Sequence, residues 1–211
     1  MNANPHQGQQ LVRAGTELPN AAGALILLHG RGGSAADILE LGRSLSPAGW
    51  ALLAPQAAGH TWYPYSFLAP REQNEPYLTS ALEQVRSVVA TSVAAGIPRE
   101  KLVLAGFSQG ACLGSEFVGR NAARYGGLLA FTGGLVGPLG LPLSLSGDLA
   151  GTPVLLSSGD PDPHVPRDRV AETADLMRRI NGSVLLRRYP GRPHTISTDE
   201  MEVAREVLAK V

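Results

Sequence analysis

The chain has 211 residues, of which 44% are hydrophobic and 17% are charged, so it can bury one substantial core. Its formal net charge of zero gives no attraction toward nucleic acid or an anionic membrane surface, which favours a small neutral or apolar substrate. The single cysteine, Cys112, excludes an internal disulfide, and no apolar stretch reaches the roughly 18 residues of a membrane span.

The chain begins with a polar segment, residues 1–22. Its first ten residues lack the basic start and apolar centre of a signal peptide, so we expect cytoplasmic residence. About twenty residues precede the first strong strand, which leaves room for one short edge strand around residues 10–14.

Six apolar runs have the composition of buried strands, and helix-period segments separate most of them. This alternation predicts an α/β fold in one domain, residues 1–211. Its central sheet is mostly parallel, with about six to seven strands, flanking helices and no cap domain. The runs are residues 25–28, 51–54, 102–105, 128–131, 154–157 and 184–189.

Helix starts are marked between these runs by two capping-box pairs and one proline. Two long connections stand out, residues 60–74 with four aromatic side chains and residues 133–151 rich in Gly, Pro and Leu. The helix-start signals are Ser34 with Asp37, Pro76, and Ser197 with Glu200.

Ser108 lies in the pentapeptide Gly-Phe-Ser-Gln-Gly, directly after the run at residues 102–105 and before the helix-compatible residues 111–118. A serine on a sharp strand-to-helix turn sits in strained backbone space, where side chains at the flanking positions would collide. Gly106 and Gly110 remove that collision. The context therefore predicts a nucleophile elbow.

A serine nucleophile needs a histidine to take its proton and a carboxylate to orient that histidine. Reactive groups in a parallel sheet lie beyond the carboxyl ends of its strands, which selects Asp160, Asp162 and His194. Spacing does not separate the two aspartates, but two flanking prolines restrain Asp162, so we favour it. His164 is too close to the acid in sequence to be oriented easily by it.

Two backbone amides must also face the oxyanion of the tetrahedral intermediate. Gln109 follows the nucleophile, and Arg31 lies in the glycine-rich loop after the first strong strand. A phosphate-binding loop is the alternative for residues 29–33, but the signature of such loops is absent. The Arg31 side chain either carries surface charge or meets a substrate carboxylate.

We assign no catalytic role to three other titratable side chains. His6 and His60 are expected on solvated segments, although His60 could line a pocket, and Cys112 is expected inside the protein one helical turn after Ser108. No His, Cys and Asp cluster has metal-ligand spacing, so we expect no metal and no cofactor.

Four ordered motifs together resemble the phospholipase/carboxylesterase family of α/β-hydrolases, which includes acyl-protein thioesterases. The resemblance runs from about Ala24 to the C-terminus and implies that Ser108, Asp162 and His194 form the triad and that the amides of Arg31 and Gln109 form the oxyanion hole. Gly33 departs from the acidic residue of the thioesterases, so the chain looks closer to bacterial carboxylesterases. The motifs are residues 28–33, 106–111, 160–166 and 194–196.

The resulting prediction is a carboxylesterase that cleaves short- to medium-chain esters through an acyl-Ser108 intermediate, with thioesters and lysophospholipids as neighbouring substrate classes. A non-catalytic ligand-binding hydrolase fold and an amidase or peptidase stay open as alternatives. Residues 135–145 are a candidate dimer or lipid contact. The predicted pocket walls, which sequence does not separate from core, are Trp62, Tyr63, Phe67, Leu135 and Val136.

Overall fold

The computed structural model describes residues 4–140 and 142–211, and these residues form seven β-strands and five α-helices. The strands are β1 (Leu11–Gly15), β2 (Gly23–Leu28), β3 (Trp50–Pro55), β4 (Leu102–Phe107), β5 (Gly127–Phe131), β6 (Pro153–Asp160) and β7 (Ser183–Pro190). The α-helices are α1 (Ala35–Leu45), α2 (Tyr77–Ala94), α3 (Gln109–Arg120), α4 (Arg167–Arg179) and α5 (Thr198–Leu208). Short 3-10 helices cover Leu18–Asn20, Ala58–His60, Arg71–Asn74 and Arg99–Lys101.

All seven strands form one sheet in the order β1-β3-β2-β4-β5-β6-β7. Only β1 is antiparallel to its neighbour, and it pairs along β3 from Leu11 opposite Pro55 to Gly15 opposite Ala51. The other neighbours are parallel. The sequence prediction of a single-domain, mostly parallel α/β-hydrolase sheet is confirmed, and β1 occupies the predicted edge position.

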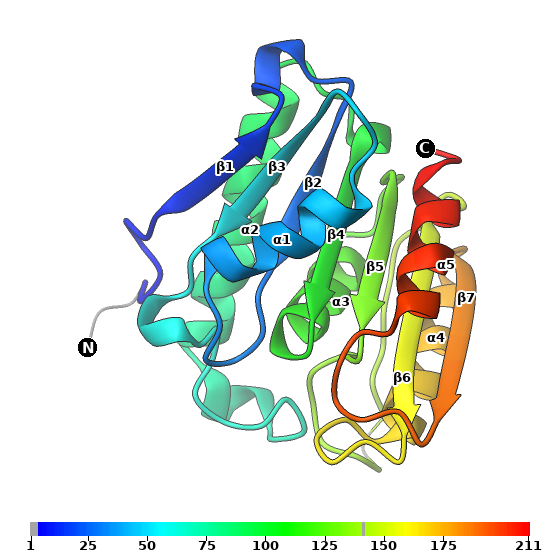
Figure 1. Cartoon of the computed structure of the whole chain (residues 1–211). Coiled ribbons are helices and arrows are strands. Elements are labelled where there is room, and N and C mark those ends of the chain that lie inside the picture. The colour runs from blue at the N-terminus through cyan, green and yellow to red at the C-terminus, as the bar shows by residue number, and fades with distance from the viewer. Residues whose placement is uncertain (1–3, 141) are drawn as a thin grey trace.

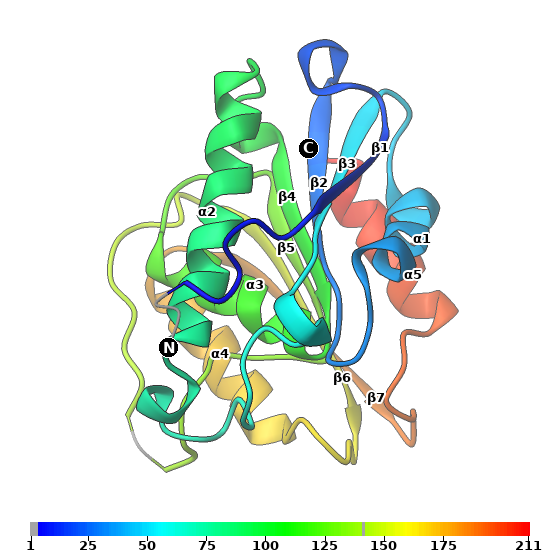
Figure 2. The same cartoon turned by 90° about the vertical axis from the view of Figure 1, so that its left-hand side faces the viewer.

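Helices cover both faces of the sheet, so the central strands are buried on both sides (Figure 1). Helices α1 and α5 pack on one face over one apolar cluster, and α2, α3 and α4 pack on the other face over a second. Figure 2 shows the two helix layers with the sheet between them. None of the described helices is long and apolar enough to cross a bilayer.

The two predicted capping-box pairs lie at the starts of helices in the structure. Ser34 caps α1 with Asp37, and Ser197 caps α5 with Glu200, each through a complete capping box. The sequence predicts Pro76 as the first helical residue, but it is the N-cap residue of α2, and the helix begins one position later, at Tyr77.

Because β2, β4, β6 and β7 run parallel, the loops that follow their carboxyl ends meet at one edge of the sheet (Figure 1). Those loops carry residues 29–34, Ser108, residues 161–166 and residues 191–197. The topology therefore brings the predicted triad and oxyanion residues together from four distant parts of the chain.

Candidate active site

Ser108 is the single residue between β4 and α3, and its backbone has φ 54° and ψ −118°. This strained conformation is held by close backbone packing at the two flanking glycines. A Cβ on Gly106 would lie 2.5 Å from the backbone of Gly110, and a Cβ on Gly110 would lie 2.0 Å from the carbonyl oxygen of Leu28. The glycines therefore allow the sharp turn that exposes the Ser108 hydroxyl.

The structure joins Ser108, His194 and Asp162 in one hydrogen-bonded chain. His194 Nε2 lies 2.9 Å from Ser108 Oγ, and His194 Nδ1 lies 2.9 Å from Asp162 Oδ2 and 3.1 Å from Oδ1. The Asp162 carboxylate is fully buried, whereas the His194 side chain is 18% exposed. A histidine held this way presents Nε2 to the serine as a proton acceptor.

Asp162 has the more constrained carboxylate of the two candidate aspartates. Its Oδ1 accepts hydrogen bonds from the amides of His164 and Val165, both at 2.9 Å. Burial alone would raise the pKa of Asp162, but the hydrogen bonds from His194 and these amides outweigh it and lower the pKa. Asp160 instead pairs with Arg188 and, at 3.8 Å, with Arg167.

The His194 ring is confined by two other rings. Phe107 lies 5.0 Å from it between centroids, and His164 lies edge-on at 4.8 Å. His164 contacts the acid only through its backbone amide, so the structure gives it no triad geometry.

The loop after β2 is fixed by a buried, neutral histidine. His29 Nδ1 lies 2.8 Å from the Gly30 carbonyl, and Nε2 accepts a hydrogen bond from the Ala57 amide at 3.2 Å. These partners assign the Nδ1–H tautomer, and burial lowers the pKa of His29.

Arg31 and Gln109 have backbone amides suited to an oxyanion. The Arg31 amide has no acceptor within residues 4–140 and 142–211. Gln109 is the first residue of α3, so its amide has no partner one turn earlier in the helix. Both residues line the same pocket as Ser108.

The side chains of these two residues bind one connecting loop. Tyr63 O accepts from Arg31 Nη2 at 3.0 Å and from Gln109 Nε2 at 2.8 Å. Arg31 also donates to the carbonyls of Pro64 and Tyr65, at 2.9 and 2.7 Å. The loop at residues 61–65 thus ties the two amide-bearing residues together, and sequence reasoning left this role of Arg31 open.

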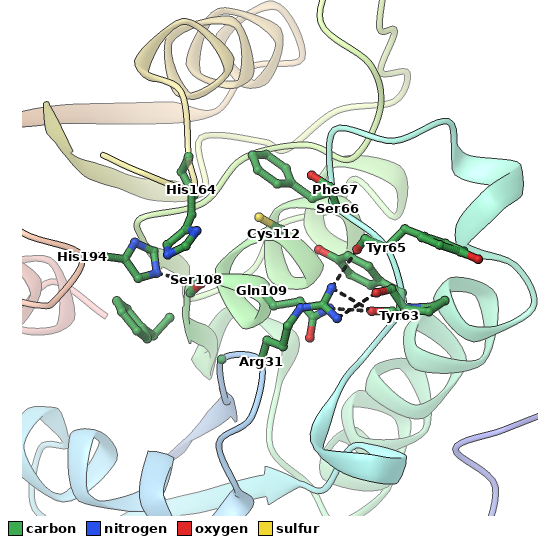
Figure 3. Close-up of a pocket in the computed structure, with 14 residues that line it drawn as sticks. Arg31, Tyr63, Tyr65, Ser66, Phe67, Ser108, Gln109, Cys112, His164 and His194 are labelled. Carbon is green, nitrogen blue, oxygen red and sulfur yellow. Dashed lines mark hydrogen bonds between the residues drawn. The ribbon is translucent and has the colours of Figure 1, made fainter. Parts of the chain in front are cut away.

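The pocket has a volume of about 450 Å³ (Figure 3). Two of the expected wall residues, Tyr63 and Phe67, line it together with residues that the sequence did not single out as walls. The lining residues are Gly30, Arg31, Tyr63, Pro64, Tyr65, Ser66, Phe67, Phe107, Ser108, Gln109, Cys112, His164, Val165 and His194.

Three predicted wall residues lie elsewhere. Trp62, Leu135 and Val136 are fully buried in the core and are not among the residues that line the pocket. The Trp62 indole donates to the His29 carbonyl at 2.8 Å. The amides of Leu135 and Val136 are bound to Thr173 and Glu116, which holds this segment against α3 and α4.

The expectations for the other titratable side chains agree with the structure in two cases and are wrong in one. Cys112 is buried as expected, and burial raises the pKa of its thiol to about 12, so no reactive thiolate forms near neutral pH. His60 is exposed as expected. The expectation for His6 is wrong, because its ring is buried between the Trp62 carbonyl at 2.9 Å and the Ala58 amide at 3.0 Å.

The apolar stretch at residues 135–145 is only partly surface. Leu139 is 47% exposed, whereas Leu143 and Leu145 pack against the core. Residue 141 lies outside the described residues.

Comparison with known proteins shows which family the chain resembles over most of its length. A family model described as Phospholipase/Carboxylesterase matches residues 14–211. The crystal structure of a phospholipase/carboxylesterase from Dyadobacter fermentans is 48% identical, with a TM-score of 0.92 over 96% of this chain and 97% of that one.

Curated relatives match over shorter regions. Acyl-protein thioesterase 1 of Neurospora crassa is 26% identical over 149 residues, 66% of this chain and 58% of the relative. A probable carboxylesterase of Oryza sativa is 30% identical over 131 residues, 61% of this chain and 48% of the relative. The match thus spans roughly half to three-fifths of these relatives.

Proposed function

The chain belongs to the phospholipase/carboxylesterase family of α/β-hydrolases, and from this premise we propose that it is a serine hydrolase of short- to medium-chain carboxylic esters or thioesters. The observation that carries the proposal is the unbroken hydrogen-bonded chain from Ser108 Oγ through His194 to buried Asp162 at a pocket wall. The names of the relatives, carboxylesterase and acyl-protein thioesterase, support the same reaction class.

In the first half of the proposed reaction, His194 Nε2 takes the proton of Ser108 as Oγ attacks the acyl carbon. The carbonyl oxygen becomes an oxyanion, and the amides of Arg31 and Gln109 donate to it. Asp162 stabilises the imidazolium. Collapse of the intermediate breaks the bond to the leaving oxygen or sulfur, which receives the proton from His194, and leaves acyl-Ser108.

In the second half, His194 takes a proton from water, whose oxygen attacks the acyl carbon. The second tetrahedral intermediate expels Ser108 Oγ, which regains its proton from His194, and the free acid leaves. Every proton passes through one imidazole nitrogen, so the geometry at Nε2 serves both halves.

The pocket supports a limited acyl length. Its apolar walls come from Tyr63, Phe67, Phe107 and Val165, and Tyr63 and Phe67 are almost fully buried. We expect kcat/KM to rise from acetate to butyrate or octanoate and to decline for acyl chains longer than about twelve carbons.

A fluorophosphonate probe with intact-protein mass spectrometry tests the mechanism, alongside hydrolysis of p-nitrophenyl acetate, butyrate, octanoate and palmitate. The wild type should gain one label and turn over, and Ser108→Ala should do neither. Stoichiometric ester binding without labelling or release of acid would instead support a ligand-binding role. Comparison of matched ester and amide substrates separates an esterase from an amidase.

A further inference from the structure

The residues that line the pocket carry one permanent charge, and it is positive. Of the fourteen lining residues none is acidic, and Arg31 is the one arginine or lysine among them. The net charge of the whole chain is zero, so this local imbalance is a property of the pocket and not of the protein surface as a whole.

The Arg31 guanidinium is held in place without being neutralised. Three backbone carbonyls, those of Tyr63, Pro64 and Tyr65, accept its hydrogen bonds at 2.7 to 3.0 Å (Figure 3). A guanidinium has five N–H donors, so two remain for another acceptor. In the described part of the chain, no carboxylate oxygen lies within 4.0 Å of it.

Two other arginines are held in a comparable way, and each has a glutamate as partner. Arg169 donates to the carbonyls of Leu135 and Pro138 and pairs with Glu172 at 3.1 Å. Arg192 donates to Thr132 and pairs with Glu200 at 3.2 Å. Arg31 is likewise held by hydrogen bonds, but it is exposed where Arg169 and Arg192 are buried, and it lacks the counter-charge.

Carboxylates of neighbouring segments are engaged elsewhere. Asp37 binds the N-cap residue of α1, Glu116 lies between Arg71 and Arg120, and Asp162 binds His194. None of these three carboxylates is therefore free to pair with Arg31, which leaves its charge available to an anion that enters the pocket.

We propose that the preferred substrates carry a carboxylate near the ester bond and that the Arg31 guanidinium selects it. This inference rests on the proposed esterase function, and it names the substrate class of the same site. A cation already fixed by three hydrogen bonds loses little conformational freedom when it binds an anion, which favours selectivity. Because Arg31 is exposed, salt should weaken the effect.

The test compares matched anionic and neutral esters. On the acyl side, monoethyl adipate is compared with ethyl hexanoate. On the alcohol side, 4-acetoxyphenylacetate is compared with its methyl ester. In wild-type protein at low salt we expect kcat/KM for the anionic member of at least one pair to be higher by about fivefold, and this ratio should fall when 0.5 M sodium chloride is added. The pair that responds identifies the side that carries the carboxylate.

Two variants of Arg31 separate the effect of its charge on substrate preference from the effect of its hydrogen bonds to the loop. Arg31→Lys keeps the charge but not the three-way hydrogen bonding, whereas Arg31→Gln keeps a hydrogen-bond donor but removes the charge. Because the Arg31 amide belongs to the proposed oxyanion hole, absolute rates are not compared. The ratio of anionic to neutral kcat/KM within each variant should stay high in Arg31→Lys and fall to about one in Arg31→Gln.

Equal or lower kcat/KM for both anionic esters in wild-type protein would overturn the inference, and so would a ratio that survives in Arg31→Gln. The wild-type salt series decides the matter even if a variant fails to fold. Hydrolysis of the neutral esters keeps the proposed function separate, because an esterase without anionic preference would still cleave them. No turnover of any ester and no fluorophosphonate labelling would instead contradict the esterase function itself.

Discussion

Two aspartates of β6 and the loop after it differ in their partners, although they lie two residues apart. Asp162 is buried against His194 and two amides, whereas Asp160 is partly exposed beside two arginines. Sequence spacing could not separate them, because both follow the same apolar run, residues 154–157. The partner, and not the position along the chain, defines the role of each carboxylate.

Substitution of each aspartate by asparagine should therefore have very different effects on kcat. Asp162→Asn should lower kcat by about four orders of magnitude, since an amide cannot hold the productive His194 tautomer. Asp160→Asn removes ion pairs with two half-exposed arginines outside the triad, and kcat should stay within about threefold of wild type. Steady-state hydrolysis of p-nitrophenyl butyrate measures both, and similar losses in the two variants would contradict the assignment of the acid.

A second residue-scale prediction concerns the Tyr63 hydroxyl. This oxygen is buried without a normal hydrogen bond, beside the Cys112 thiol, which is a weak acceptor, and burial raises the pKa of Tyr63. Tyr63→Phe should leave the free energy of unfolding unchanged or higher. Tyr125→Phe is the matched control, because that hydroxyl donates to the Asn121 carbonyl at 2.9 Å, and its loss should cost about 1 kcal/mol. Urea unfolding of both variants tests this, and an equal cost would contradict it.

Among the elements, the loop between β7 and α5 carries His194, and a buried ion pair anchors it. Glu200 closes the capping box of α5, accepts from Ser157 at 2.6 Å and pairs with Arg192, two residues before His194. Glu200, the third residue of α5, thus stabilises both the start of this helix and the loop that positions the proposed general base, His194.

The two capping boxes provide a matched comparison of this dual role. Glu200→Gln should lower the free energy of unfolding by about 3 kcal/mol, because Arg192 is left buried without a counter-charge. Asp37→Asn at the same position of α1 is exposed and should cost about 1 kcal/mol or less. Urea denaturation measures the difference. Comparable losses would mean that the ion pair adds nothing beyond the cap.

The elements themselves were predictable, and the pocket was only partly so. Five buried strands, both capping boxes and the nucleophile elbow each come from residues close together in sequence, so local patterns suffice to predict them. The sixth predicted run forms β7, which lies at the edge of the sheet and is only partly buried. Which aromatic side chains of the 60–74 loop face the pocket depends on distant anchors such as Gln109 and Arg31. Trp62 and Tyr63 are adjacent in sequence, yet one packs in the core and the other lines the pocket.

At the scale of the whole molecule, a cluster of three rings links the N-terminal segment to the proposed oxyanion loop. Trp62 lies 5.8 Å from the His6 ring and 4.8 Å from the His29 ring. No local pattern predicts this, because His6 and Trp62 are 56 residues apart. The segment before β1 therefore packs, through His6 and Trp62, against the loop after β2 and supports it.

The two histidines of this ring cluster make the free energy of unfolding depend on pH. Burial lowers the pKa of both His6 and His29, so both rings are neutral in the folded protein. In the unfolded chain each titrates near about 6.5. Below that pH the unfolded state binds more protons than the folded state. The contribution of each histidine to the free energy of unfolding is therefore fully present above the unfolded pKa and is lost as the pH falls toward the lower folded pKa.

Each histidine should contribute a slope of up to about 1.4 kcal/mol per pH unit within that window. The free energy of unfolding in urea, measured at pH 7.5, 6.5, 5.5 and 5.0, should therefore decline on acidification. His6→Gln should reduce the slope, because Gln cannot take up a proton, although it also loses one of the two ring hydrogen bonds and is less stable at pH 7.5. An unchanged slope in this variant would mean that His6 is not one of the groups that link protonation to unfolding.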